Sequence, residues 1–312
     1  MPATDSPLDD HTLDVSIVLP VHNEVGHLAD ELDRINSSME ASPYSWELLV
    51  VDDGSTDGSV EIARGRPNVR VLRSGRNRGA GTARRIGTEA AQGRIVVWSD
   101  ADMSYPNHEI PQLVEKLGTN DHIVGARTSE QGTLKLFRVP AKWIIRRLAS
   151  YLTKTDIPDL NSGFRAFRRD VALQYTHQLP AGFSCVTTIT MAFLMNGYSV
   201  EYTSIEYLTR AGESKFHWLA DTRRYALQVI RMILSYDPLR VVLPIASLVG
   251  FVFVGKLGYD LVDKDFRPAA NTLLLGFALL QLLVIGLLAD LVVRVSRPER
   301  RVPPGDVIEE LN

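Results

Sequence analysis

The sequence predicts an α/β fold: a mostly parallel sheet flanked by helices, followed by an interfacial amphipathic helix and two transmembrane helices. Three observations support this expectation. Apolar segments alternate with segments of helical spacing through residue 127. Polar clusters follow four of the apolar segments. Two long, almost uncharged apolar segments occupy residues 241–259 and 272–293.

The alternation in the first part of the chain is typical of βαβ units. Each short apolar run reads as a buried strand and is followed by apolar residues at helical spacing, which favours parallel pairing of the strands. The expected strands lie in 14–24, 46–59, 68–74, 94–102 and 122–127. The expected helices lie in 24–40, 59–66, 79–92 and 108–118.

The four polar clusters fall where expected strands end. In parallel sheets, ligands bind outside the carboxyl ends of the strands. We therefore expect the clusters to line one crevice. They read "HNE" (22–24), "DDGS" (52–55), "SDAD" (99–102) and "GAR" (125–127).

The "DDGS" cluster places Asp52 and Asp53 before a glycine. A turn with side-chain hydrogen bonds to the backbone explains this pattern without any ligand. The alternative is recognition of a nucleotide, because carboxylates accept hydrogen bonds from a base or from ribose hydroxyls.

The "SDAD" cluster places Asp100 and Asp102 one residue apart. A solvated turn is one interpretation. The other is a metal site, since two such carboxylates repel each other unless a cation lies between them. Oxygen ligands with open positions suit Mg²⁺ or Mn²⁺ holding a diphosphate.

Arginines accompany these clusters. Converging guanidinium groups suit phosphate, whereas each one alone is equally explained as a solvated surface charge. The arginines closest to the expected strand ends are Arg73, Arg76, Arg78 and Arg127.

Composition narrows the function classes. The net charge of −3 gives no basic field for nucleic acid, and the single cysteine, Cys185, excludes an internal disulfide. Residues 1–13 are polar, without the pattern of a secretory signal, and we expect a disordered lead-in there.

The two apolar segments are long enough to cross a bilayer; a pair of buried core helices is the alternative. Arginines precede the first segment and follow the second, so we expect the termini and the soluble domain to be cytoplasmic. Residues 294–312 would then form a cytoplasmic tail. The basic and aromatic stretch at 216–238 predicts a juxtamembrane amphipathic helix; an ordinary surface helix is the alternative.

The motifs occur in an order that resembles a known family. They read "LPVHNE", "VVDDGSTDGS", "NRGAGTARRIG", "SDADMSYP", "GAR", "DLNSGFRAFRR" and "RAGESKF". Together they resemble a family 2 glycosyltransferase of the GT-A (Rossmann-like) fold, in its dolichol- or polyprenyl-phosphate branch with two C-terminal transmembrane helices. The resemblance covers roughly residues 14–220 and implies a catalytic domain over 14–215.

The resemblance implies roles for individual residues. It implies nucleotide binding by Pro20, Asn23, Glu24, Asp52, Asp53, Arg76, Asp100 and Ala101. It implies metal binding by Asp100 and Asp102, and catalysis by these two residues and by Arg127, an arginine near the donor and acceptor phosphates. It implies an acceptor-phosphate site from Arg127, Arg146, Ser150, Arg165 and Lys215. The "RAGESK" stretch is one residue shorter than the family's late motif, and "MSYP" departs from the usual residues after the metal motif.

The implied reaction is inverting transfer of one hexose-type sugar from a nucleotide-diphosphate sugar to a membrane polyprenyl phosphate, with Mg²⁺ or Mn²⁺ as cofactor. A UDP-sugar is the favoured donor and GDP-mannose the alternative. No Gln-x-x-Arg-Trp motif is present, which argues for single transfers. Other readings are a diacylglycerol or protein acceptor, or a non-catalytic membrane protein that binds sugar nucleotides. The subgroup also implies a homo-oligomer, with a tetramer as one option.

Overall fold

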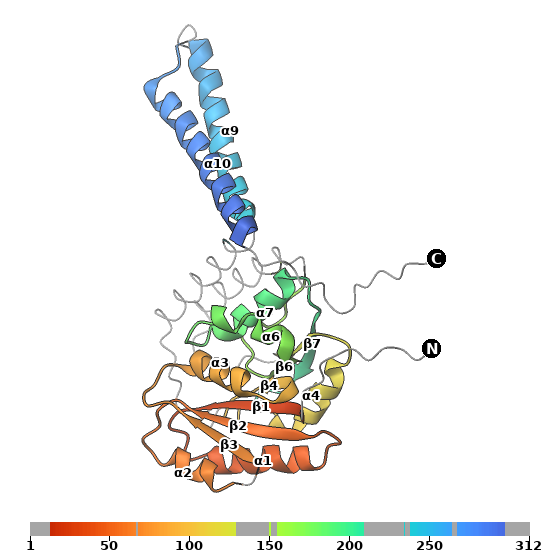
Figure 1. The fold of residues 1–312 in the computed structure, drawn as a ribbon. Helices are drawn as coiled ribbons and strands as arrows, with labels where there is room; N and C mark the ends of the chain where they lie inside the picture. Colours follow the sequence, from red (N-terminus) through yellow and green to blue (C-terminus); the bar gives the residue numbers. More distant parts are fainter. Residues whose placement is uncertain are drawn as a thin grey trace, which may run out of the picture. The chain divides into compact units, whose positions relative to one another are not determined.

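The chain folds into two units, Met1–Tyr225 and Ala226–Asn312. The computed structural model describes residues 13–66, 68–128, 150, 155–208, 234, 238–263 and 267–296. Within this part, the first unit is an α/β fold and the second is a pair of helices (Figure 1). The predicted fold class is confirmed for both. The predicted helix at 216–238 lies outside the described residues, apart from 234 and 238.

The first unit is built on a seven-stranded sheet with the strand order β3-β2-β1-β4-β6-β5-β7. Every neighbouring pair is parallel except the two pairs made by β6. The mostly parallel sheet predicted from the alternation is therefore confirmed. The strands are β1 (Leu13–Val21), β2 (Trp46–Asp52), β3 (Val69–Arg73), β4 (Gly93–Trp98), β5 (His122–Arg127), β6 (Arg165–Arg168) and β7 (Val200–Ile205).

Helices cover both faces of the sheet (Figure 1). Side chains alternate between faces along a strand, so Ile17 and Leu19 of β1 pack on one side and Val18 on the other. The first face is covered by α1 (Leu28–Glu40), α2 (Ser59–Arg64) and α4 (Ile110–Leu117). The second is covered by α3 (Ala80–Ala90), α6 (Arg169–Leu173) and α7 (Cys185–Met195). Two 3₁₀ turns, η1 (Asn107–Glu109) and η2 (Thr176–Gln178), complete the described unit.

Strands β6 and β7 were not among the five predicted strands: β6 lies between β4 and β5, and β7 lies at the edge of the sheet beside β5. β6 is only four residues long and pairs antiparallel with both β4 and β5. Because it runs opposite to its neighbours, its beginning lies at the edge where β4 ends, with Arg165 opposite Trp98. The "NSG" segment before β6 is thereby delivered to the same edge as the predicted clusters.

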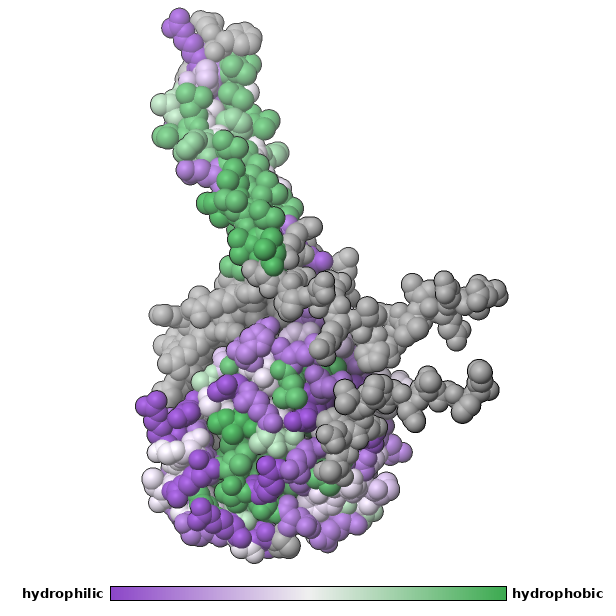
Figure 2. All heavy atoms as spheres, in the orientation of Figure 1, coloured by the Kyte–Doolittle hydropathy of each residue, from purple (hydrophilic) through white to green (hydrophobic). Residues whose placement is uncertain are grey.

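The second unit is a hairpin of α9 (Leu239–Asp263) and α10 (Ala270–Ser296), each long and apolar enough to cross a membrane. Large apolar side chains such as Phe251 and Val262 are 80% and 88% exposed, and apolar residues make up most of the visible surface of the hairpin (Figure 2). The core-helix alternative does not fit such exposure. Gly276 permits close approach, since a Cβ there would lie 2.7 Å from the Phe253 ring.

The buried His122 predicts acid-sensitive stability. It is fully buried between Phe167 and Phe193, and neither ring nitrogen has a hydrogen-bond partner among the described residues. Burial, aided by the Arg165 charge, holds its pKa well below the ordinary value of 6.5. The folded protein therefore keeps this ring neutral, while the unfolded chain binds a proton below pH 6.5.

We expect the free energy of unfolding to fall as pH drops below about 6.5, by up to about 1.4 kcal/mol per pH unit from this group. His122→Leu should lose that part of the slope. Denaturant unfolding of both proteins between about pH 7 and pH 5 measures it. Equal slopes in the two proteins would contradict the assignment.

Candidate active site

The carboxyl edge of the parallel strands gathers the four predicted clusters. β1 ends at Val21, β2 at Asp52, β4 at Trp98 and β5 at Arg127, and each is followed by, or ends in, one cluster. This placement agrees with the expected crevice at a sheet edge. Some of the predicted residues face this edge. Others form hydrogen bonds and ion pairs within the protein.

The loop after β1 is tied to the loop after β2. Asn23 has a left-handed φ of 55°. Its Oδ1 accepts a 2.9 Å hydrogen bond from the Thr56 amide, and its own amide donates to Ser55 Oγ at 3.0 Å. The Glu24 amide donates to Ser59 Oγ at 3.0 Å. Pro20 is half-buried opposite Val51. These bonds fix the backbone of the predicted nucleotide side of the crevice.

The aspartate pair after β2 organises a neighbouring loop. Both oxygens of Asp53 accept backbone hydrogen bonds, at 2.8 Å from the Arg78 amide and 2.7 Å from the Gly79 amide. Asp52 is fully buried and accepts from the Ser55 amide at 3.1 Å. The turn interpretation thus fits Asp52, whereas Asp53 bonds the backbone of a loop 25 residues further along the chain. A base or ribose could still donate hydrogen bonds to the carboxylate oxygens of Asp52 and Asp53, and this contact stays a prediction.

Gly54 explains why glycine follows this pair. It has a φ of +76°, and a Cβ there would lie 2.7 Å from the Arg76 carbonyl carbon. The close packing holds the backbone of residue 76 against the turn, while the Arg76 residue itself is exposed. Contact of Arg76 with a nucleotide stays a prediction.

Asp100 is ion-paired with Arg84 of α3, a residue that the sequence motifs did not single out. Arg84 Nη2 bonds Asp100 Oδ1, and the side chains are 1% and 26% exposed. The guanidinium carbon lies 5.7 Å from the Trp98 ring centroid, and Nη1 lies 3.6 Å from Cys185 Sγ. Burial alone would lower the pKa of Arg84, but the Asp100 charge raises it above its ordinary value. Arg84 therefore compensates the charge of the first aspartate.

Asp102 is held differently. It is 6% exposed, and its Oδ1 accepts hydrogen bonds from the Ser104 amide at 3.1 Å and from Ser104 Oγ. Met103 between them has a left-handed φ of 62°, which is uncommon for such a side chain. Ala101 is buried at 3%. The two aspartates are therefore held in distinct ways, one by a buried arginine and the other by a serine turn.

Asp100 and Asp102 could hold a divalent ion only if a bound substrate supplied further ligands to it. Within the described residues, no group of three or more His, Cys, Asp or Glu side chains could hold a metal. Mg²⁺ is commonly bound by one or two carboxylates with water and substrate phosphates completing its shell. The donor set here matches that mode. Asp102 is the better candidate ligand, because the charge of Asp100 is already compensated by Arg84.

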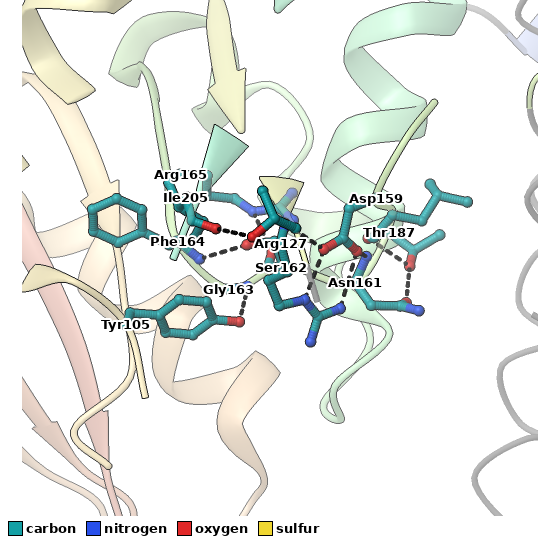
Figure 3. A network of polar contacts seen from close by, with 12 residues as sticks. Tyr105, Arg127, Asp159, Asn161, Ser162, Gly163, Phe164, Arg165, Thr187 and Ile205 are labelled. Atoms are coloured by element: carbon teal, nitrogen blue, oxygen red, sulfur yellow. Dashed lines mark hydrogen bonds and ion pairs between the residues drawn. The ribbon is translucent and has the colours of Figure 1, made fainter. Parts of the chain in front are cut away.

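Arg127 at the end of β5 forms a bidentate ion pair with Asp159 (Figure 3). Its Nε and Nη2 donate to the two carboxylate oxygens at 2.7 and 3.0 Å. Burial would raise the pKa of Asp159, but the Arg127 bonds and charge hold it below its ordinary value. Among the described residues, Arg127 Nη1 has no hydrogen-bond partner.

Arg165 does not reach the crevice in this structure. It is fully buried, and its guanidinium donates to the carbonyl of Ser162 (Figure 3). It also donates to the carbonyl of Val186 and to Thr190 Oγ1. Burial, with the charge of Arg84, lowers its pKa to about 10. Its role here is to fix the "NSG" segment, so the predicted contact with an acceptor phosphate is not supported by its placement.

The remaining acceptor-site predictions are only partly described. Ser150 Oγ accepts a 3.3 Å hydrogen bond from the Ile157 amide. Arg146 and Lys215 lie outside the described residues. Tyr105 borders the same region: its hydroxyl accepts from the Gly163 amide at 2.7 Å, and its ring stacks on Phe164.

The sequence motifs did not identify Arg84 and Asp159 as residues of the site. Each forms an ion pair with a residue that is distant in the chain. Arg84 lies 16 residues from Asp100, and Asp159 lies 32 residues from Arg127. The sequence did indicate that Arg84 is buried, because it lies at helical spacing from the small residues Gly81, Gly87 and Thr88, which are buried in α3. Nothing in the local pattern identified its partner.

The fold and the polar clusters at the strand ends define a GT-A glycosyltransferase architecture. Structures of glucosyl-3-phosphoglycerate synthase from Mycobacterium tuberculosis share it. One of them, a complex with Mn²⁺, UDP-glucose and phosphoglyceric acid, has a TM-score of 0.56, 20% identity, and coverage of 71% of this chain and 80% of that one.

The chain belongs to glycosyl transferase family 2, whose family model matches residues 16–176. An undecaprenyl-phosphate 4-deoxy-4-formamido-L-arabinose transferase of Aeromonas hydrophila is 31% identical over 309 residues, which is 93% of this chain and 91% of the relative. A dodecaprenyl-phosphate galacturonate synthase of Rhizobium johnstonii is 30% identical over 170 residues. That match spans 52% of this chain and half the length of the relative.

Proposed function

We propose that this protein is an inverting, metal-dependent glycosyltransferase that moves one hexose-type sugar from a UDP-sugar to a membrane polyprenyl phosphate. The observation that carries the proposal is the Asp100–Asp102 pair at the strand edge of a family 2 domain, on a chain that also has two exposed apolar helices. Relatives named as undecaprenyl- and dodecaprenyl-phosphate transferases support the acceptor class.

The chemistry of a phosphate acceptor suits the charges at this edge. A sugar hydroxyl acceptor would need a placed base to remove its proton, whereas a phosphate is already an anion. Asp100 and Asp159 are each committed to an arginine, and an ion-paired carboxylate is a weak base. Arg127, whose Nη1 takes no part in the Asp159 pair, is suited to orient the acceptor phosphate.

The transfer proceeds by attack of an acceptor phosphate oxygen on the anomeric carbon while the bond to the donor diphosphate breaks. Attack from the face opposite the leaving group inverts the anomeric centre. Asp102 would hold Mg²⁺ or Mn²⁺, which would supply positive charge to the leaving diphosphate. Asp52, Asp53, Asn23 and Arg76 form the nucleotide side in this proposal.

The membrane arrangement follows from the same proposal. A polyprenyl acceptor stays in the bilayer, so the catalytic domain has to work at the headgroup level. We propose that α9 and α10 span the membrane with the catalytic domain and both termini cytoplasmic, since basic residues such as Arg240 precede the apolar part of α9. The boundaries predicted at 216–238 and 294–312, and a homo-oligomer, belong to this proposal.

Transfer of radiolabelled sugar to a set of lipids tests the acceptor. The full-length protein in detergent receives UDP-sugars with Mn²⁺ and either polyprenyl phosphate, diacylglycerol or no lipid. We expect label on polyprenyl phosphate alone. Label on diacylglycerol would overturn the acceptor, and binding without any transfer would favour the non-catalytic alternative.

Thermal unfolding with added nucleotides tests the donor. A ligand at about 100 times its Kd stabilises the folded state by about 2.7 kcal/mol. We expect a rise in Tm with UDP-sugars and Mn²⁺ but none with GDP-mannose at the same concentration. The reverse order would replace the UDP-sugar with GDP-mannose.

A further inference from the structure

The loop that carries Asp100 and Asp102 rests on a buried polar cluster at α1. The cluster consists of Glu31 and Arg34 from α1 and Asn107 from η1, and we call it the α1 clamp. Glu31 and Asn107 are both fully buried, and the Arg34 side chain is 20% exposed. None of these residues belongs to the sequence motifs described above.

Asn107 connects the clamp to the metal motif. Its Nδ2 donates to Glu31 Oε1 at 2.8 Å and to the Asp100 carbonyl at 3.3 Å, while its Oδ1 accepts from Ser99 Oγ. The side-chain amide thus contacts α1 and two consecutive residues at the start of the motif. Because an amide has separate donor and acceptor ends, the Glu31 carboxylate determines which end faces Asp100.

Arg34 attaches the other end of the same loop. Its Nη2 donates to the Tyr105 carbonyl at 2.8 Å, and the guanidinium also bonds both oxygens of Glu31. Asp102 lies between the two attachment points in the sequence. The segment from Ser99 to Tyr105 is therefore held at both ends by one cluster.

Burying the carboxylate of Glu31 costs free energy of folding, which its contacts or its function must offset. Burial raises the pKa of Glu31 and the hydrogen bonds of Arg34 and Asn107 oppose this; the charge of Asp102 raises it further. Glu31 therefore lies in the electrostatic field of Asp102. Apolar residues of similar volume are often at least as stable as a buried ion pair, so stability alone does not account for Glu31.

We propose that Glu31 and Asn107 are positioning residues that preset the backbone of the Asp100–Asp102 loop for the divalent ion and the donor diphosphate. Neither touches the ion; they act through the Asp100 carbonyl, Ser99 and the Arg34–Tyr105 bond. The inference rests on the proposed function in that it takes Asp102 as a metal ligand.

Mn²⁺ binding to the full-length protein with UDP, followed by electron paramagnetic resonance of the free ion, tests the inference without turnover. Residues that orient metal ligands typically contribute about 10- to 100-fold in metal affinity. We expect Glu31→Gln to weaken Mn²⁺ binding about 10-fold. Binding of UDP in EDTA, measured by thermal shift, should change little.

Glu47→Gln is the matched control. Glu47 is also a buried carboxylate, bonded to Ser16 Oγ at 2.6 Å and to Arg70 at 2.6 Å. It lies at the beginning of β2, whereas Asp52 and the crevice lie at the end. We expect a comparable loss of stability and unchanged Mn²⁺ affinity. Equal Mn²⁺ affinities for both variants would overturn the inference, whether both are weakened or both unchanged.

Ser99→Ala provides a second variant if Glu31→Gln does not fold. It removes the hydroxyl that donates to Asn107 Oδ1 and should weaken Mn²⁺ binding about threefold, the equivalent of roughly 0.6 kcal/mol. Unchanged affinity in a folded Ser99→Ala protein would count against the clamp. Wild-type protein that binds Mn²⁺ with UDP but transfers no sugar would refute the proposed function and leave the inference standing. Wild-type protein that binds no Mn²⁺ would overturn the inference.

Discussion

Replacing Arg84 with methionine is expected to destabilise the protein by about 3 kcal/mol. Removing one partner of a buried ion pair typically costs about 3–5 kcal/mol, because the other charge is left without compensation. The lower end of that range applies because the Asp100 side chain is 26% exposed and part of its charge can be hydrated. Urea unfolding of the full-length protein in detergent, followed by near-ultraviolet circular dichroism, measures the loss.

Arg85→Met is the control for this prediction. Arg85 is the next residue in α3, but it is 39% exposed and lies 3.7 Å from Glu89, which is 43% exposed. Such a surface pair contributes less than about 0.5 kcal/mol. Arg84→Lys should fall between the two, since lysine keeps the charge but loses the planar fork. If the Arg84→Met variant were as stable as the Arg85→Met variant, the assigned role of Arg84 would be refuted.

The layout of the sheet was predictable because it depends on local patterns. β1, β2, β4 and β5 each contain a buried apolar run and are followed by, or end in, polar residues, which is typical of strands buried on both faces. The common edge of β1, β2 and β4 then follows from parallel pairing, and β5 ends at the same edge because β6 pairs antiparallel with both β4 and β5. β6 was missed because its four residues, "RAFR", carry charge at both ends and show no strand pattern.

The contacts of the site were less predictable than its location. The sequence suggested that a bound cation relieves the repulsion between Asp100 and Asp102, but on the Asp100 side that cation is Arg84. Arg165 was predicted to contact the acceptor phosphate, yet its guanidinium donates to buried protein oxygens. Such pairings depend on the packing of α3 and α7 against the sheet, which no local pattern encodes.

Asp102→Asn is expected to reduce turnover about 10²- to 10³-fold, because the charge that stabilises the leaving diphosphate would be less firmly held. Asparagine keeps an oxygen that can accept the Ser104 hydrogen bonds, so the loop should retain its shape. Removing the negative charge also relieves repulsion with Glu31. The free energy of unfolding should therefore stay equal or rise while turnover falls, as measured by lipid-linked product formed per minute.

Asp121→Asn separates this effect from a general response to losing a carboxylate. Asp121 accepts hydrogen bonds from the amide and hydroxyl of Ser199, both at 2.9 Å, much as Asp102 accepts from Ser104. It precedes β5 and so lies at the opposite edge from the crevice. Turnover should be unchanged in this variant. If Asp102→Asn retained full turnover with Mn²⁺, the metal-site interpretation would be wrong; if Asp121→Asn lost as much, the charge would matter for folding rather than for transfer.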